Sequence, residues 1–281
     1  MTSTFGIASR SRRLDFVHAI ATFARTVWIG GAGILAGPSV LAGRCIFYAF
    51  LLTVLSTFWD KVAHERAPGG MAHLLPLGGL ALYIGVTEWV TLGTPSIHLR
   101  LEDDIRSVGL EARLLRPKSH LLMRLGEGVG AMLVRIGAIG AVALTLLALS
   151  GRPGLPLAIY PALLAVGVLG GVVGVLNLAL VGLCAFWLKR TLPVYLVNQK
   201  LSFVLGGLLA PITLYPGWLR HIGSLSPYAA QLYWPAALTI TPTADTFARA
   251  AASQLVWIAI LGLAVLGLWT LGLRKVLREG S

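Results

Sequence analysis

The chain has 281 residues, of which 56% are hydrophobic and only 12% are charged, about half of the charged share of a soluble domain. This composition excludes a soluble globular class, and uncharged runs such as 155–188 are typical of helices that cross a bilayer. The formal net charge of +12 does not indicate nucleic-acid binding, because the Lys and Arg residues cluster between apolar stretches without an aromatic stacking surface.

Residues 1–39 are predicted to form a cytoplasmic and interfacial N-terminal segment. Apolar residues recur there at steps of four and three, namely Phe16, Ile20, Phe23 and Val27. This spacing predicts an amphipathic helix over 12–28 that lies in the membrane interface. The glycine-rich stretch that follows is broken by Pro38. We expect it to be interfacial or half-inserted and not a span, although the pattern alone does not decide whether 28–43 insert.

Residues 40–281 are predicted to form one transmembrane domain. Its apolar stretches predict six membrane-spanning helices, at about 40–59, 74–92, 131–149, 162–188, 200–220 and 255–273. The fourth is longer than a bilayer needs and has no polar hairpin to divide it, so it is expected to be one long tilted helix. Its glycines, Gly167, Gly170, Gly171 and Gly174, favour close helix packing, within the chain or between subunits.

The distribution of Lys and Arg predicts the orientation. With the N-terminus in the cytoplasm, seventeen basic residues fall inside and five outside, and Arg135 stays within the third span. Cytoplasmic loops carry the excess of positive charge. The sequence therefore predicts that both termini are cytoplasmic.

A charged segment, 101–117, lies between the second and third predicted spans. Its apolar residues alternate at steps of four and three, namely Leu101, Ile105, Val108, Ala112 and Leu115. The acids at 102–104 fall where a first turn would start, close to the positive end of the helix dipole, and Pro117 limits the other end. The pattern predicts a short amphipathic helix whose stripe packs against the membrane, the protein itself or a partner.

The segment "DIRSVGLEARLLRPKS", 104–119, resembles the cytoplasmic loop between spans two and three of type-2 ATP-binding-cassette (ABC) exporter permeases, in a bacterial uncharacterised-permease subgroup. The resemblance is carried by Ile105, Gly109, Leu114, Leu115, Arg116 and Pro117. It implies a coupling helix that docks on a separate ATPase subunit. The residues it implies for coupling are Asp104, Ile105, Gly109, Leu115, Arg116 and Pro117.

A second segment, 210–238, resembles the external re-entrant segment that precedes the last span in the same family. The resemblance is carried by four prolines, Pro211, Pro216, Pro227 and Pro235. Broken helix of this kind is tolerated at membrane depth only where protein or a water-filled cavity covers it.

The family resemblance also implies the partners. The permease would bind no cofactor, ATP and Mg would bind to a pair of cytoplasmic ATPase subunits, and a second permease, identical or related, would complete a dimer surrounded by membrane lipids. The chain has no G-x-x-x-x-G-K-[ST] motif for binding ATP itself. Export as opposed to import is implied by the resemblance alone.

Three polar residues fall inside predicted spans, and such residues are functional candidates. Glu88 and Arg135 are candidates for an ion pair, for snorkelling to the interface or for a substrate contact, and Asn177 for a contact between helices or a transport path. The six histidines do not have the spacing of a zinc motif, and no metal site is predicted.

Together these features predict an all-α permease subunit of an ATP-driven exporter in a bacterial inner membrane. The subunit itself is not expected to be an enzyme. Alternatives that remain open are a secondary transporter, an intramembrane enzyme and a structural membrane subunit. A lipid, an amphipathic drug or a hydrophobic peptide would each suit an apolar cavity between two permeases, so the substrate is not predicted.

Overall fold

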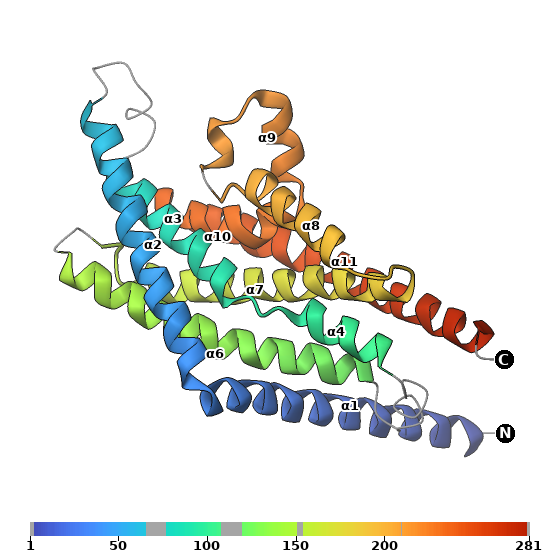
Figure 1. Ribbon diagram of the computed structural model, residues 1–281. Helices are drawn as coiled ribbons and strands as arrows, with labels where there is room; N and C mark the ends of the chain where they lie inside the picture. The colour runs from blue at the N-terminus through green and yellow to red at the C-terminus, as the bar shows by residue number, and fades with distance from the viewer. Residues whose placement is uncertain (1–2, 66–76, 108–119, 151–153, 209, 280–281) are drawn as a thin grey trace.

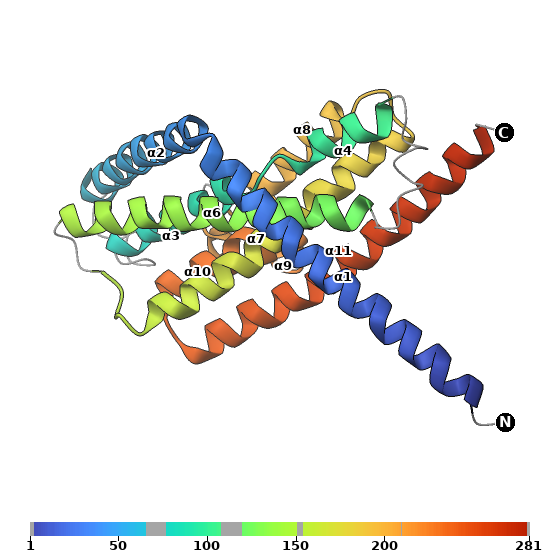
Figure 2. The same ribbon diagram turned by 90° about the horizontal axis from the view of Figure 1, so that it is seen from below.

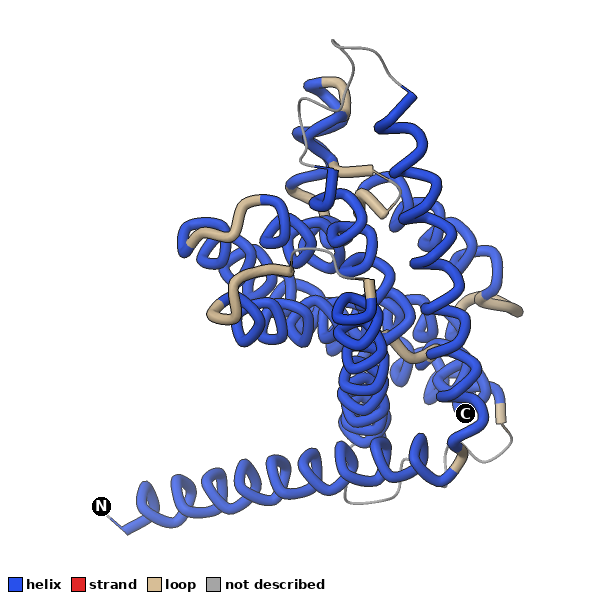
Figure 3. The backbone as a smooth tube through the Cα atoms, turned by 90° about the vertical axis from the view of Figure 1, so that its left-hand side faces the viewer, coloured by secondary structure: helices blue, strands red, loops and turns tan. Residues whose placement is uncertain are grey.

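The computed structural model describes residues 3–65, 77–107, 120–150, 154–208 and 210–279, and most of them are helical. Within these ranges no residue forms a strand, and short turns connect the helices (Figures 1 and 3). The helical class predicted from composition is confirmed for this part of the chain.

The long helices are α1 (Ser3–Ala36), α2 (Pro38–Glu65), α3 (Leu77–Gly93), α6 (His120–Leu149), α7 (Ile159–Leu183) and α11 (Ala244–Glu279). The shorter helices are α4 (Ile97–Arg106), α8 (Leu192–Leu205), α9 (Gly217–Ser224) and α10 (Trp234–Ile240). Single turns are η2 (Cys184–Phe186), η3 (Ile212–Leu214) and a π-helical turn, η4 (Ala229–Tyr233).

Five helices in the described part of the chain are long and apolar enough to cross a membrane. They are Ala19–Ala36, Pro38–Phe58, His120–Leu149, Ile159–Phe186 and Ala244–Arg278. The last four contain the predicted first, third, fourth and sixth spans. A multi-pass membrane protein is therefore supported by the length and composition of these helices.

The predicted fifth span, 200–220, is wrong. The helix α8 ends at Leu205 and has only 14 residues, too few to cross a hydrocarbon core of about 30 Å. The chain turns at Gly207, whose φ of +66° is readily adopted only by glycine, and it continues into η3 and α9. The predicted second span corresponds to α3, which has 17 described residues and is shorter than the five helices above.

The N-terminal stretch also differs from the prediction. Residues 29–36 are not separate from the preceding helix but continue α1, and the helix stops where Pro38 begins α2. Their interfacial placement stays a prediction. The last half of α1, Ala19–Ala36, is long and apolar enough to span. The first part of α1 projects beyond the rest of the bundle (Figures 2 and 3).

The helices α1 and α6 cross in close backbone contact. A Cβ atom at Gly30 would lie 2.1 Å from the carbonyl oxygen of Glu127, and one at Gly130 would lie 1.8 Å from that of Val27. Only residues without a side chain permit this approach, as in small-xxx-small helix pairs. The four-residue spacing of Gly126 and Gly130 is a sequence signal for this crossing.

The central helix of the bundle is α7. Of its most apolar window, 56% is buried, against at most 22% for the other four candidates. Its glycines face neighbours within the chain, since Gly167 lies against the Trp89 ring of α3 and Gly171 against Met132 of α6. Packing within the chain therefore accounts for these two positions.

Both termini, the end of α4, the start of α6 and the α7–α8 connection lie at the same end of the bundle (Figure 1). The α6–α7 and α10–α11 connections lie toward the opposite end. We call the first of these the terminal end. Most of the segments that the charge distribution assigned to the cytoplasm thus share one end of the structure, whereas the start of α2, which was assigned to the same side, lies away from it.

Candidate functional site

The short helix α4 is wedged against the central helix α7. Ile97 and Leu101 are buried on the face that α4 turns inward. A Cβ atom at Gly182 of α7 would lie 2.9 Å from both the Cα of His98 and the Cβ of Leu101. The glycine therefore lets α4 pack directly on the α7 backbone. Leu101, the first residue of the predicted apolar stripe, is thus buried within the protein itself.

An acidic residue of α4, Asp104, is tied to the first turns of α6. The carboxylate is 5% exposed and accepts two hydrogen bonds from Arg124, at 2.5 Å from Nε and 2.8 Å from Nη2. His120 Nε2 lies 2.9 Å from the same carboxylate. Burial by itself would raise the pKa of Asp104, but the hydrogen bonds and charges of Arg124 and His120 lower it overall. Asp104 is therefore a carboxylate at neutral pH.

A second acid, Glu102, ties α4 to the α7–α8 connection. It accepts hydrogen bonds from the hydroxyl and the backbone N–H of Thr191, which is fully buried. Arg106 lies 3.3 Å from Glu102 and donates to the carbonyl oxygen of Leu188 at 3.1 Å. Burial opposes ionisation of Glu102, but the Thr191 hydrogen bonds and Arg106 lower its pKa overall. We call these residues, with Asp104, His120 and Arg124, the α4 network.

The last helix, α11, joins the α4 network through the turn η2. Lys275 donates to the carbonyl oxygen of Phe186 at 3.0 Å, and the Phe186 ring packs against Gly272 and Trp269. Trp269 also stacks on His120. Four elements far apart in sequence, α4, α6, α7 with its following turn, and α11, are therefore connected at the terminal end.

A buried histidine lies beside this network. His98 stacks on Tyr195 of α8, with ring centroids 4.3 Å apart and planes 12° from parallel. Its Nδ1 atom is buried and has no hydrogen-bond partner. Burial lowers the pKa of His98, against the opposing charge of Glu102. His98 is therefore held as a neutral ring at neutral pH.

The residues that the resemblance assigned to coupling are only partly described. Asp104 is in the α4 network, and Ile105 is half-buried against the hydrophobic core. Gly109, Leu115, Arg116 and Pro117 lie outside the described residues. The predicted start of the helix is wrong, because α4 begins at Ile97 and ends at Arg106. The acids at 102–104 therefore lie in its second half and not in a first turn, and Glu102 and Asp104 make the side-chain contacts described above.

The polar residues predicted inside spans are separate from one another. No ion pair joins Glu88 and Arg135, both of which are described and 9% exposed. Arg135 Nη1 is buried without a hydrogen-bond partner. Asn177 of α7 interacts with the Tyr228 hydroxyl, which in turn donates to Asn198 of α8 at 3.0 Å. This arrangement supports the interpretation of Asn177 as a contact between elements.

The four predicted prolines mark breaks in the chain between α8 and α11. Pro211 immediately precedes η3, Pro216 precedes α9 and Pro235 lies in the first turn of α10. Pro227 falls between α9 and the π-helical turn η4. The π-helical turn η4 and α10 are covered by the rest of the protein, as residues 229–232 and 235–239 are buried, whereas Pro216 and most of α9 are exposed. The chain is thus broken at these prolines, and an external, re-entrant placement of the segment stays a prediction.

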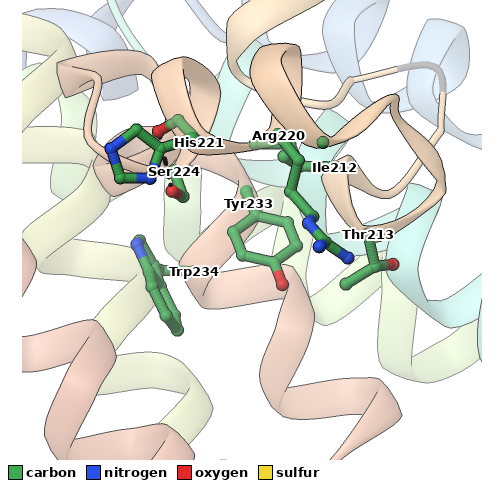
Figure 4. Close-up of a pocket in the computed structure, with 8 residues that line it drawn as sticks. Ile212, Thr213, Arg220, His221, Ser224, Tyr233 and Trp234 are labelled. Atoms are coloured by element: carbon green, nitrogen blue, oxygen red, sulfur yellow. Dashed lines mark hydrogen bonds between the residues drawn. The ribbon is translucent and has the colours of Figure 1, made fainter.

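A cavity of about 310 Å³ lies beneath α9 in this broken segment (Figure 4). Its lining is polar on one side and aromatic on the other, and consists of Ile212, Thr213, Gly217, Arg220, His221, Ser224, Tyr233 and Trp234. The buried Trp234 Nε1 has no hydrogen-bond partner. The cavity therefore offers a cation and an unused N–H donor to a small polar group.

Comparison with known proteins gives no family for this chain. No protein-family model matches it, and no curated protein matches it. In the described part of the chain, no group of three or more His, Cys, Asp and Glu side chains is arranged to hold a metal ion. The main feature of the described geometry is the α4 network, whose hydrogen bonds and ion pairs link α4 to three other elements at the terminal end.

Proposed function

We propose that this chain is the membrane-spanning permease subunit of an ATP-driven exporter and that a separate ATPase subunit docks at the terminal end. The observation that carries the proposal is the α4 network. When a partner subunit displaces a helix, that displacement reaches the rest of the bundle only if the helix is fixed to the other helices that must move. Through Asp104–Arg124 and Glu102–Thr191, α4 is fixed to α6 and to the α7–α8 connection.

Rigid attachment matters because transport needs two states that a partner can bias. Coupling between sites is carried by packed elements that have discrete arrangements. Because α4 packs directly on Gly182, α4 and α7 have little room to move relative to each other. A displacement at the end of α4 would therefore turn α6, α7 and α8 together, as in rigid-body switching.

Two further features support the proposal. The segment after α4 carries the motif that resembles the coupling helix of ABC exporter permeases. The broken segment 206–240 precedes the last long helix, as in that family. In the proposal the partner ATPase pair binds ATP and Mg, a second permease completes the dimer, and the substrate is amphipathic or lipid-like.

The test is purification of the tagged chain from its native host in a mild detergent, with mass spectrometry of the proteins that accompany it. We expect a stoichiometric partner with a G-x-x-x-x-G-K-[ST] motif. A chain that purifies alone, and whose proteoliposomes show flux driven by an ion gradient but not by ATP, would instead establish a secondary transporter.

The reconstituted complex then tests the docking site. Arg116→Glu should abolish ATP-driven transport while the chain still folds and reaches the membrane, because it reverses the charge offered to the ATPase. Arg249→Glu, a matched reversal on an exposed arginine in the first turns of α11, toward the opposite end of the bundle, should retain transport. Equal transport by Arg116→Glu and the wild type would contradict docking at this segment.

A further inference from the structure

Among the described residues, no carboxylate forms an ion pair with the buried arginine Arg135. It lies on α6, is 9% exposed, and its Nη1 atom has no hydrogen-bond partner. The charged groups that act on it are both positive, Arg44 of α2 and Arg100 of α4. Burial of an unpaired charge is costly, and an ionisable residue within a span is a functional candidate by default.

The carboxylates of the same helix region are already engaged. Glu127 of α6 accepts from Arg124 at 2.7 Å and lies 3.7 Å from Arg100. Asp104 accepts from Arg124, and Glu88 makes no ion pair with Arg135. The positive charge of Arg44 and Arg135 is therefore not neutralised by a carboxylate in the described part of the chain. An anion from outside the chain would neutralise it.

Each of the two arginines is followed by a long uncharged stretch of its helix. Residues 45–59 of α2 and 136–151 after Arg135 carry no charge. Arg44 donates to the carbonyl oxygen of Leu92, at the end of α3, at 3.1 Å, and Ile136 lies against Gly93. Arg44, the end of α3 and the turn of α6 that follows Arg135 therefore lie at one level of the bundle. Basic side chains next to long uncharged helix surface attract anionic lipid headgroups.

The surface beside Arg44 favours a lipid over a soluble anion. Val40, Ile46 and Phe47 of α2 are all exposed, and a Cβ atom at Gly43 would meet no other atom within 4 Å. An acyl chain could lie along this open apolar face while its phosphate reaches the guanidinium groups. Arginine binds phosphate through parallel N–H···O bonds.

We propose that Arg44 and Arg135 form a binding site for the phosphate of an anionic phospholipid, with Arg100 adding to the positive field. The site holds the start of α2 against α3 and α6 at the corner where α1 turns into α2. It does not depend on the chain being a permease, and it holds equally for the alternatives weighed above.

The experiment uses the full chain, purified in detergent and delipidated, as wild type, Arg135→Gln, Arg44→Gln and the matched control Arg274→Gln. The control removes one positive charge from the exposed basic surface of α11. Thermal midpoints are measured with added phosphatidylglycerol, phosphatidylcholine or sodium phosphate, and native mass spectrometry counts the bound lipids. We expect phosphatidylglycerol to raise the midpoint of the wild type and of Arg274→Gln by several degrees more than phosphatidylcholine does.

Arg135→Gln should lose most of this lipid-specific rise and the corresponding bound-lipid peak. If Arg135→Gln does not fold, Arg44→Gln should show the same loss, because Arg44 is half-exposed and tolerates substitution better. Equal rises in the wild type and in both variants would overturn the proposal. So would a rise produced by sodium phosphate alone, since that result would assign the site to a soluble anion.

Discussion

The buried pair between Asp104 and Arg124 gives the sharpest test of the α4 network. In Asp104→Asn the side chain keeps its shape and one acceptor oxygen but loses its charge, so the Arg124 guanidinium loses its bidentate partner. Removing one member of a buried ion pair costs about 3–5 kcal/mol. Because Arg124 retains Glu127 at 2.7 Å, we expect the lower end, about 3 kcal/mol.

This loss should lower the thermal midpoint by roughly 6–12 °C, at the 2–4 °C per kcal/mol typical of large domains. The assay is intrinsic tryptophan fluorescence on heating in detergent. The neighbouring Asp103 is exposed, so Asp103→Asn is the matched control and should change stability by less than about 0.5 kcal/mol. A double variant with Arg124→Gln should lose less than the sum of the single losses.

The pH dependence follows from the lowered pKa of Asp104. A carboxyl whose pKa is lower in the folded state adds stability above its unfolded pKa, about 3.9, and loses it as the pH falls through the folded value. The gap between the wild type and Asp104→Asn should therefore persist from pH 7 to 5 and shrink below about pH 4. A midpoint for Asp104→Asn equal to that of Asp103→Asn would refute the structural role assigned to the pair.

Two further predictions concern the contacts of α4 with its neighbours. Gly182→Ala should destabilise the protein by about 1–3 kcal/mol, since the new Cβ would lie 2.9 Å from His98. Gly262→Ala, on the open face of α11, is the control and should be neutral or stabilising. Thermal midpoints measure both variants, and equal midpoints would contradict close packing of α4 on α7. Because burial lowers the pKa of His98, the unfolded chain binds more protons and stability should fall as the pH drops below about 6.5. His98→Gln should reduce this loss of stability in acid, and His221→Gln, at an exposed position, should not. The assay is the thermal midpoint of each variant from pH 7.5 to 5. A dependence of the midpoint on pH that is unchanged in His98→Gln would argue against a buried neutral ring.

Much of the fold was predictable because long apolar stretches have few alternatives to a helix in a bilayer. The predicted first, third, fourth and sixth spans correspond to α2, α6, α7 and α11. The fifth failed because hydropathy does not register backbone geometry: Gly207 takes a positive φ, and α8 stops before it. Pro211 and Pro216 fall both in this predicted span and in the segment predicted to be broken, and the structure shows the break.

The candidate site was predictable only in its location. Patterning identified 101–117 as a charged amphipathic segment, but it treated the acids at 102–104 as dipole partners of a first turn. Their actual partners, Arg124 and Thr191, are distant in sequence, and no local rule pairs them. The same holds for Arg135, which was a candidate for pairing with Glu88 and instead lies near Arg44 and Arg100.

The sequence by itself determined that the chain is a bundle of apolar helices. The composition and the length of the uncharged stretches set the free energy gained when side chains are removed from water. The sequence also indicated breaks at Pro38 and in the proline-rich segment 210–238. Only the tertiary structure decided which helix lies at the centre, which glycines bring backbones together, and which charges meet. Those outcomes depend on the packing of surfaces that are far apart along the chain, and the energy of a buried charge depends on what three-dimensional neighbours it finds.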